Sequence, residues 1–356
     1  MCQAASKKGS SCRFIYPALV FVVIFGIYTI FLTHNMIPQI QRLQLAPGEA
    51  PADPHVVHGS TAEVAALMAV FHVLFLMIIA CYARTMLTSP GYIPQTSFWK
   101  EGDFVILERH NAVVRSLIAD PAEAITDEDR DVIRQLPVVE RKQQSGKFRY
   151  CKLCCTFKPD RTHHCSMCGR CVLRMDHHCP WVSNCIGYAN YKYFLLLLLY
   201  VCVTLVFVVG AMMPRFINVF KAFHSWSLFL QWDLPVILAY VLTVFLAGVL
   251  INFFIYHLTL VARAMTTIEH KEKHNSRDET IRRRWEIANI KFDLGSTYLN
   301  LRHVMGPPLT WLLPVNGANA DEDAGTYRFG PWMDIDNHAG ATNTTAAADK
   351  GGYARV

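Results

Sequence analysis

Cysteine and histidine are concentrated in one short part of the chain, where residues 151–185 contain eight cysteines and four histidines. Thiolate sulfur and imidazole nitrogen are the usual ligands of tetrahedral structural zinc, and repeated Cys-x2-Cys pairs with nearby histidines form a strong zinc signal. Two closed zinc sites need eight donors, whereas this stretch offers twelve. Some of these side chains are therefore available for other chemistry.

The tetrad Asp176-His177-His178-Cys179 is the candidate for that chemistry. A cysteine thiol has a usual pKa of about 8.5 and is mostly protonated at neutral pH, so a nucleophilic cysteine needs a base beside it. His177 is the candidate base for Cys179, and Asp176 is suited to orient the imidazole and to stabilise its charged form. Because Pro180 restricts the backbone, we expect a sharp turn to bring residues i and i+2 together. The alternative is that the whole tetrad serves only to bind zinc.

Four apolar segments lie on both sides of the cysteine-rich stretch and contain no Lys, Arg, Asp or Glu: residues 14–33, 64–82, 193–213 and 234–258. The chain of 356 residues is 52% hydrophobic, which is high for ordinary soluble domains. A helix needs about 20 apolar residues to cross the hydrocarbon core of a bilayer. We therefore predict four transmembrane helices rather than buried core helices, with the first retained as an anchor rather than cleaved as a signal peptide.

Basic residues are distributed unequally between the connections. The loops at 34–63 and 214–233 contain three Lys or Arg between them, whereas residues 87–192 contain fifteen and the segment after residue 258 contains twelve. Because basic residues collect on the cytoplasmic side of a membrane, both termini and the long central loop are expected in the cytosol. The reducing cytosol favours metal binding or catalysis by the cysteines over disulfides.

The net charge of +6 is thus expected at the cytosolic membrane surface, where it favours anionic lipids or an anionic cofactor. The sequence contains no basic helix with interleaved aromatic residues, which is the pattern that would indicate nucleic acid binding.

The order of these residues resembles the cysteine-rich domain of the DHHC family of protein S-acyltransferases, the palmitoyltransferases. The pattern is C-x2-C-x9-HC-x2-C-x2-C-x4-DHHC-x5-C, placed between the second and third apolar segments. Thr266-Thr267-Ile268-Glu269 matches the family's TTxE motif, and residues 88–91 resemble its Asp-Pro-Gly motif with Ser89 in place of Asp. Residues 300–306 and 311–314 resemble its C-terminal motif, with Met305 where an aromatic is common.

The resemblance implies an all-α polytopic membrane protein with four transmembrane helices and a cytosolic two-zinc domain between helices 2 and 3. By position, the first zinc site would use Cys151, Cys154, His164 and Cys171. The second would use Cys165, Cys168, His178 and Cys185. Both sets are closed and suit structural zinc, which would supply the folding energy of a domain too small for a core. Cys155 is left over, either as a packed thiol or as a second acylated cysteine.

The implied boundaries divide the chain into seven parts. They are a cytosolic N-terminus at 1–13, helices 1 and 2 with their loop at 14–86, a linker at 87–147, the cysteine-rich zinc domain at 148–192, helices 3 and 4 at 193–258, a cytosolic C-terminal domain with the TTxE motif at 259–315 and a disordered tail at 316–356. Within the linker, acidic residues that precede arginines predict a helix near residues 127–135.

The resemblance also implies the reaction. Cys179 would attack a long-chain acyl-CoA, such as palmitoyl-CoA, and the acyl group would pass to a cytosolic cysteine of a membrane-associated substrate protein. Thr267 would hydrogen-bond Asp176, and Asn300 would support the C-terminal segment against the helices. Three basic residues are candidates to contact CoA phosphates or are solvated surface charges: Lys158, Arg161 and Arg174. An endomembrane location, the Golgi first, is expected from the family alone.

Two other classes of function share part of this pattern. A zinc transporter or sensor would be expected to carry ionisable ligands within its membrane segments, and here these segments contain only His72 and His257. A catalytically silent zinc scaffold that recruits partners would keep both metal sites. A test for acylation of Cys179 would distinguish an enzyme from such a scaffold.

Overall fold

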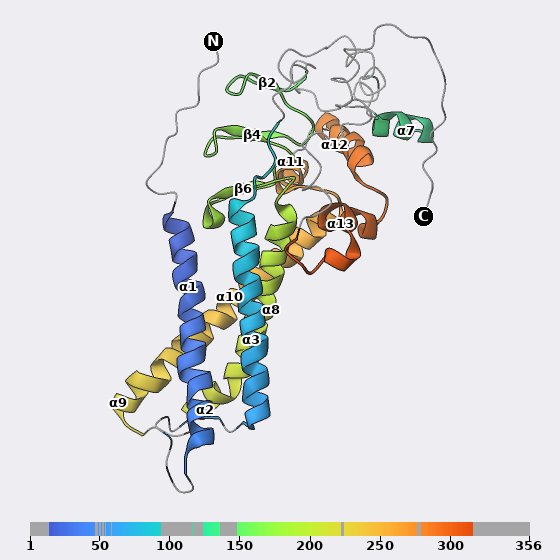
Figure 1. Ribbon diagram of the computed structural model, residues 1–356. Coiled ribbons are helices and arrows are strands. Elements are labelled where there is room, and N and C mark those ends of the chain that lie inside the picture. Colours follow the sequence, from blue (N-terminus) through green and yellow to red (C-terminus); the bar gives the residue numbers. More distant parts are fainter. Residues whose placement is uncertain are drawn as a thin grey trace, which may run out of the picture.

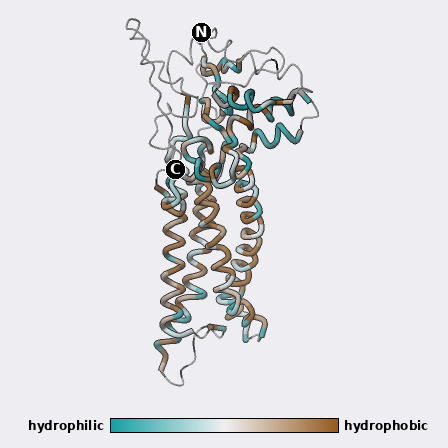
Figure 2. The backbone as a smooth tube through the Cα atoms, turned by 90° about the vertical axis from the view of Figure 1, so that its right-hand side faces the viewer, coloured by the Kyte–Doolittle hydropathy of each residue, from teal (hydrophilic) through white to brown (hydrophobic). Residues whose placement is uncertain are grey.

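The computed structural model describes residues 14–46, 59–93, 124–135, 148–221, 224–275 and 279–315, together with positions 49, 51, 53, 55–57 and 116. The expected N-terminal segment 1–13, the tail 316–356 and most of the linker 87–147 lie outside these residues. Long helices lead into a region of short strands and then into shorter C-terminal helices (Figure 1). Figure 2 shows apolar residues along the long helices and more polar residues at the end that carries the strands.

The first two long helices are separated by a loop. The first runs through α1 (Ile15–Phe31), the π-helical η1 (Leu32–Met36) and α2 (Ile37–Gln44) without a break. The second, α3 (Thr61–Leu87), begins at Ser60. The Ser60 side chain accepts a hydrogen bond from the backbone N–H of Glu63, whose carboxylate accepts one from the backbone N–H of Ser60. This capping box satisfies N–H groups that the first helical turn leaves unpaired.

The other two long helices form a hairpin. They are α8 (Tyr191–Val219) and α10 (Leu234–Ala262), and α10 continues from the short elements α9 (Trp226–Leu228) and η3 (Phe229–Asp233). Helix α8 packs against both α3 and α10 and is the most buried of the four long helices. All four are long and apolar enough to cross a bilayer, which confirms the expected four membrane helices. They extend beyond the apolar segments because helical hydrogen bonding continues into the flanking polar residues.

The cysteine-rich region consists of three antiparallel hairpins. Strand β1 (Tyr150–Cys151) pairs with β2 (Thr156–Phe157), β3 (His163–Cys165) with β4 (Arg170–Val172), and β5 (His177–Cys179) with β6 (Asn184–Ile186). Strands of two or three residues are too short for such hairpins to be stable alone in water. Their arrangement therefore depends on cross-links between hairpins and on attachment to the helices.

The segment after α3 provides one attachment. The carbonyl of Gly91 accepts a hydrogen bond from the backbone N–H of Leu173, and the carbonyl of Pro90 accepts one from Ala189. Gly91 has a φ of 91°, a conformation that glycine adopts without steric cost. On the other side, a Cβ at Gly187 would lie 2.8 Å from the Pro90 carbonyl oxygen, so this close approach also requires glycine. Residues 88–91 thus hold the hairpins on the end of α3.

The C-terminal segment returns to the same end of the long helices. It contains α11 (Thr267–Asn275), α12 (Glu279–Phe292), α13 (Thr297–Met305) and η4 (Pro308–Thr310). Helix α13 contacts α8 and α10, and α12 contacts α7 (Asp127–Gln135). Helix α7 confirms the helix expected near residues 127–135.

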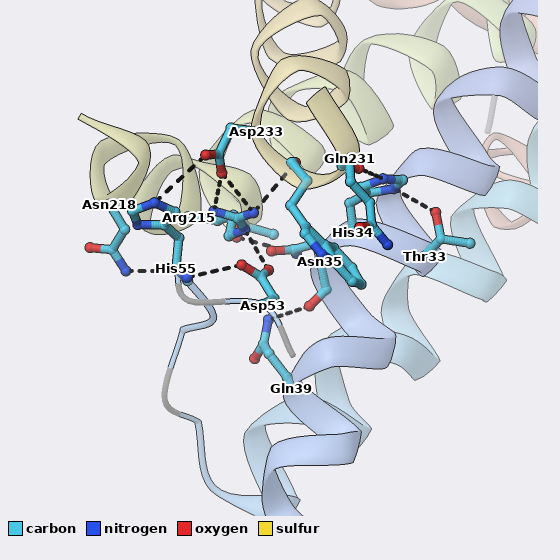
Figure 3. A network of polar contacts seen from close by, with 12 residues as sticks. Thr33, His34, Asn35, Gln39, Asp53, His55, Arg215, Asn218, Gln231 and Asp233 are labelled. Carbon is cyan, nitrogen blue, oxygen red and sulfur yellow. Dashed lines mark hydrogen bonds and ion pairs between the residues drawn. The ribbon is translucent and has the colours of Figure 1, made fainter. Parts of the chain in front are cut away.

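A buried ionic network joins the helices at the opposite end (Figure 3). Arg215 of α8 is 1% exposed, and its guanidinium lies 3.0 Å from a carboxylate oxygen of Asp53 and 3.3 Å from one of Asp233. His55 lies 3.7 Å from the other Asp233 oxygen. A buried charge is tolerated only where it is paired. The network therefore ties the loop between α2 and α3 to the α8 and α10 hairpin.

Candidate active site and metal centres

Two groups of cysteine and histidine side chains each bring four ligand atoms together. The first group is Cys151, Cys154, His164 and Cys171, and the second is Cys165, Cys168, His178 and Cys185. These are the two sets that the family resemblance implies. The first joins the β1–β2 hairpin to β3–β4, and the second joins β3–β4 to β5–β6. Each zinc site would thus cross-link consecutive hairpins.

The distances between ligand atoms fit zinc. Tetrahedral zinc with ordinary bonds to sulfur and nitrogen separates its ligand atoms by about 3.5–3.8 Å. In the first group, His164 Nδ1 lies 3.5 Å from Cys151 Sγ and 3.8 Å from Cys171 Sγ, and a shorter 3.2 Å from Cys154 Sγ. In the second, His178 Nδ1 lies 3.6 Å from Cys165 Sγ and 3.5 Å from Cys185 Sγ. Both groups therefore suit a closed structural zinc ion.

The strand β5 divides the tetrad by role. Successive side chains of a strand point to opposite faces, so His177 and Cys179 share one face while His178 points to the other. His178 and Cys185 are direct partners in the β5–β6 register and belong to the second metal group. The sharp turn that we expected between His177 and Cys179 is therefore replaced by extended backbone. Pro180 instead begins the short helix η2 (Pro180–Val182) that follows the strand.

Asp176 and His177 form a pair in which the carboxylate is buried and the imidazole is partly exposed. Asp176 is 1% exposed, and its Oδ2 lies 2.6 Å from Nδ1 of His177. Burial alone would raise the pKa of Asp176, but the hydrogen bond and positive charge of His177 outweigh it and lower that pKa. Burial alone would lower the pKa of His177, but hydrogen bonds to Asp176 and Cys179 raise it to about 9. The pair thus favours an imidazolium beside the cysteine sulfur.

Thr267 holds Asp176 from the start of α11. Its backbone N–H donates to Oδ1 of Asp176 over 2.9 Å, and its hydroxyl contacts Oδ2 at 3.2 Å and donates to the Asp176 carbonyl. The N–H groups of a helix's first turn have no partner within the helix and attract an anionic group. The structure therefore places Thr267 against Asp176, in the contact that the resemblance implies.

Glu269, two residues further on, holds Arg161. The Arg161 guanidinium donates to both carboxylate oxygens of Glu269, over 2.7 and 2.9 Å, and also to the carbonyl of Ala264. Both charged side chains are buried. This geometry does not fit the expected contact of Arg161 with CoA phosphates, because its donors are directed into the protein.

The other two candidate CoA contacts differ from each other. Arg174 is buried, and its guanidinium lies over the ring of Tyr191 at 5.7 Å from the centroid, which also does not fit a phosphate contact. Lys158 is half-buried and follows β2. Of the three candidates, only Lys158 is partly exposed. Cys155, left over by the ligand count, is half-buried in the β1–β2 turn.

Asn300 supports the C-terminal segment from α13. Its side-chain amide donates to the carbonyl of Ala262 at the end of α10, over 3.0 Å, and to Asp293 over 2.9 Å. Its oxygen accepts the backbone N–H of Leu294. The buried Asn300 thus joins the segment before α13 to the last turn of α10.

Two asparagines that sequence reasoning missed attach the β5–β6 hairpin to α3. The Asn184 side chain donates to the carbonyls of Thr85, Met86 and Thr88, with a shortest distance of 2.8 Å. Asn190 is fully buried, accepts the N–H of Gly187 and donates to the Cys185 carbonyl. The last carbonyls of a helix lack intrahelical partners, and amide side chains satisfy them here. The available signal in the sequence was the position of these two asparagines on either side of the candidate metal ligand Cys185.

The last residue of β5, Cys179, lies in apolar surroundings. Cys179 is 6% exposed and belongs to a buried cluster with side chains of α3 and α8, among them Ile78, Tyr82 and Phe194. The Tyr82 hydroxyl donates to the carbonyl of Trp181 over 2.8 Å, which fixes the chain just after Cys179. The candidate nucleophile is thus placed where the cysteine-rich region meets the membrane helices.

Comparison with known proteins agrees with this geometry. The family model described as DHHC palmitoyltransferase matches residues 144–274. The chain is 33% identical to "Probable protein S-acyltransferase 14" of Arabidopsis thaliana, over 73% of this chain and 76% of that relative. It is 33% identical to "Palmitoyltransferase ZDHHC2" of Danio rerio, over 73% of this chain and 66% of that relative. The chain therefore belongs to the DHHC palmitoyltransferase family and is an acyltransferase.

Proposed function

We propose that this acyltransferase moves a long-chain fatty acyl group from acyl-CoA to cysteine side chains of membrane-associated proteins, through an acyl-Cys179 intermediate. The observation that carries the proposal is the chain of contacts from Thr267 to Asp176, His177 and Cys179. In this arrangement an orienting group holds a carboxylate, the carboxylate holds an imidazole, and the imidazole contacts a thiol. Such a chain of contacts can activate a cysteine for nucleophilic catalysis.

The first half-reaction forms the acyl-enzyme. His177 takes the proton of Cys179, and the sulfur attacks the thioester carbonyl carbon of acyl-CoA. The bond between that carbon and the CoA sulfur breaks, and the leaving CoA thiolate takes the proton from the His177 imidazolium. Asp176 holds the ring in the tautomer with its proton on Nδ1 and stabilises the imidazolium.

The second half-reaction reverses these roles. His177 takes the proton of a substrate cysteine thiol, whose sulfur attacks the carbonyl carbon of acyl-Cys179. The bond to Cys179 breaks, and its sulfur recovers the proton from His177. One thioester is exchanged for another in each step, so the reaction needs no further energy source.

The location of Cys179 supports a fatty substrate. Exposing an acyl chain to water costs about 0.8 kcal/mol for each CH₂ group, so a long chain needs an apolar environment. The apolar cluster around Cys179 is continuous with the membrane helices α3 and α8. The chain would lie among these helices while the charged CoA stays in water, where Lys158 is our remaining candidate for a phosphate contact.

Two further parts of the proposal concern zinc and the membrane face. Zinc held by the two cysteine and histidine groups would cross-link the hairpins and fix the geometry of β5, without taking part in the chemistry. We assign the site to the cytosolic face because the segments at that end of the helices contain most of the Lys and Arg residues.

The deciding experiment uses the purified full chain in detergent with radiolabelled palmitoyl-CoA. We expect a hydroxylamine-labile label on the wild type and none on Cys179→Ser, with both proteins retaining two zinc ions. A label of equal strength on Cys179→Ser would refute the nucleophile. An unlabelled but correctly folded wild type would favour the silent zinc scaffold.

A further inference from the structure

One buried histidine beside the proposed catalytic pair has no role in the reaction as described so far. His257 lies in the last third of α10 and is 0% exposed. Its Nδ1 lies 2.9 Å from the hydroxyl of Tyr191, the first residue of α8. Its Nε2 is buried and has no hydrogen-bond partner among the described residues. A buried polar atom without a hydrogen-bond partner lowers the stability of the fold, which makes the presence of a histidine here notable.

The His257 ring lies next to the catalytic pair. One of its nitrogens lies within 4.8 Å of ligand atoms of both Asp176 and His177. Its ring centroid is 5.9 Å from that of His177 and 5.0 Å from that of Phe194, which also contacts His177 edge to face at 5.3 Å. The His177 ring is thus confined by Asp176 along its Nδ1 edge and by His257 and Phe194 beside it.

A third metal site is the first explanation to consider, because Asp176, His177 and His257 form a group of possible ligands. The distances argue against it. Nδ1 of His177 and Oδ2 of Asp176 are only 2.6 Å apart, which is a hydrogen-bond length. Zinc bonded to these atoms would hold them more than 3 Å apart, as in the two cysteine groups. Asp176 and His177 therefore share a proton through these two atoms rather than a metal ion.

We propose that His257, held by Tyr191, is a positioning residue that fixes the His177 ring between Asp176 and Cys179. Tyr191 and His257 come from α8 and α10, so the contact sets the two helices at the distance that the pair requires. In the tautomer in which the tyrosine hydroxyl donates to Nδ1, His257 is an uncharged ring with its proton on Nε2. It then places a dipole, and not a second positive charge, beside the Asp176 and His177 pair. This inference rests on the proposed acyl-enzyme mechanism.

The test measures acyl-Cys179 formation in single-turnover experiments with palmitoyl-CoA. His257→Phe keeps the ring volume and removes the partner of Tyr191, and Tyr191→Phe removes the other half of the same contact. We expect each variant to lower the acylation rate by about tenfold, and the double variant by about tenfold rather than a hundredfold, with an unchanged KM for acyl-CoA. A simple loss of folded protein would lower the amount of acyl-enzyme formed but leave the single-turnover rate constant unchanged, and it would not give this lack of additivity.

The matched control is another histidine and tyrosine contact within the membrane helices. His72 of α3 lies 3.2 Å from the hydroxyl of Tyr28, which packs against a different apolar cluster from that of Cys179. We expect His72→Phe to keep the wild-type acylation rate. Zinc analysis completes the experiment, with two ions per chain expected in the wild type and in His257→Phe.

Three results would overturn the inference. They are a wild-type acylation rate in His257→Phe, strictly additive effects of the two substitutions, or three zinc ions per chain that fall to two in His257→Phe. Each leaves the proposed function standing, because that function depends on labelling of the wild type and its loss in Cys179→Ser.

Discussion

Thr267 donates its backbone N–H to Oδ1 of Asp176 over 2.9 Å, although 91 residues of sequence separate them. The contact links the helix that follows α10 to the strand that carries the candidate nucleophile. Asp176 is thereby held on one side by Thr267 and on the other by His177, which leaves its carboxylate little freedom to rotate. The segment after the fourth membrane helix thus supports the candidate active site, although it would contribute no reacting atom.

Replacing Thr267 tests this arrangement. Thr267→Val keeps the side-chain volume and removes the hydroxyl, so Asp176 would lose two of its contacts. We expect the acylation rate of Cys179 to fall by about 10- to 100-fold, with the protein still folded and zinc-loaded. Thr267→Ser should recover most of the rate because it restores the hydroxyl. An unchanged rate in Thr267→Val would show that the backbone N–H alone suffices.

The metal groups make a prediction about folding. Cys165→Ala removes one member of the second group of candidate zinc ligands, which would cross-link the β3–β4 and β5–β6 hairpins. We expect zinc, measured by mass spectrometry, to fall below two ions per chain, and the hairpins to lose their order and become sensitive to protease. Cys202→Ala is the control, because Cys202 is buried in α8 away from both groups. Normal zinc and folding in Cys165→Ala would contradict the ligand assignment.

The raised pKa of His177 makes a prediction about pH. Because this pKa is about 9 in the folded protein and about 6.5 in an unfolded chain, the proton stabilises the fold most below pH 6.5. That contribution, roughly 3 kcal/mol at most, is lost as pH rises through 9. In Asp176→Asn the pKa of His177 should fall toward its ordinary value, because the carboxylate that raises it is gone. We therefore expect the melting temperature of the wild type to exceed that of Asp176→Asn most at pH 6, with the gap narrowing by pH 9.5. A gap independent of pH would contradict the charged pair.

The ion pair of Arg161 and Glu269 predicts a loss of stability rather than of CoA affinity. Arg161→Met leaves the Glu269 carboxylate buried without its partner, which should cost about 3–5 kcal/mol of folding free energy. The double variant Arg161→Met with Glu269→Gln should recover part of that loss. By contrast, Lys158→Ala should raise the KM for acyl-CoA at unchanged thermal stability. If Arg161→Met instead raised the KM of a fully stable protein, our earlier expectation of a phosphate contact would be correct.

The local sequence determined the elements of this protein. Runs of apolar residues without charges determined the four membrane helices, because a bilayer admits only segments of that composition and length. The spacing of cysteines and histidines, read with the family pattern, determined which side chains form the two metal groups. Both signals depend on residue type and on short separations, which are visible in a single chain.

The tertiary structure decided how those elements meet. It placed His177 and Cys179 together through the alternation of a strand, although the sequence suggested a turn. It directed Arg161 to Glu269 over 108 residues, which no local pattern indicates, and so replaced a surface charge with a buried ion pair. It also brought His257 to Tyr191 and to the pair of Asp176 and His177 from a different helix. These contacts depend on which surfaces pack against one another, and long-range packing is settled by the whole fold rather than by any segment of it.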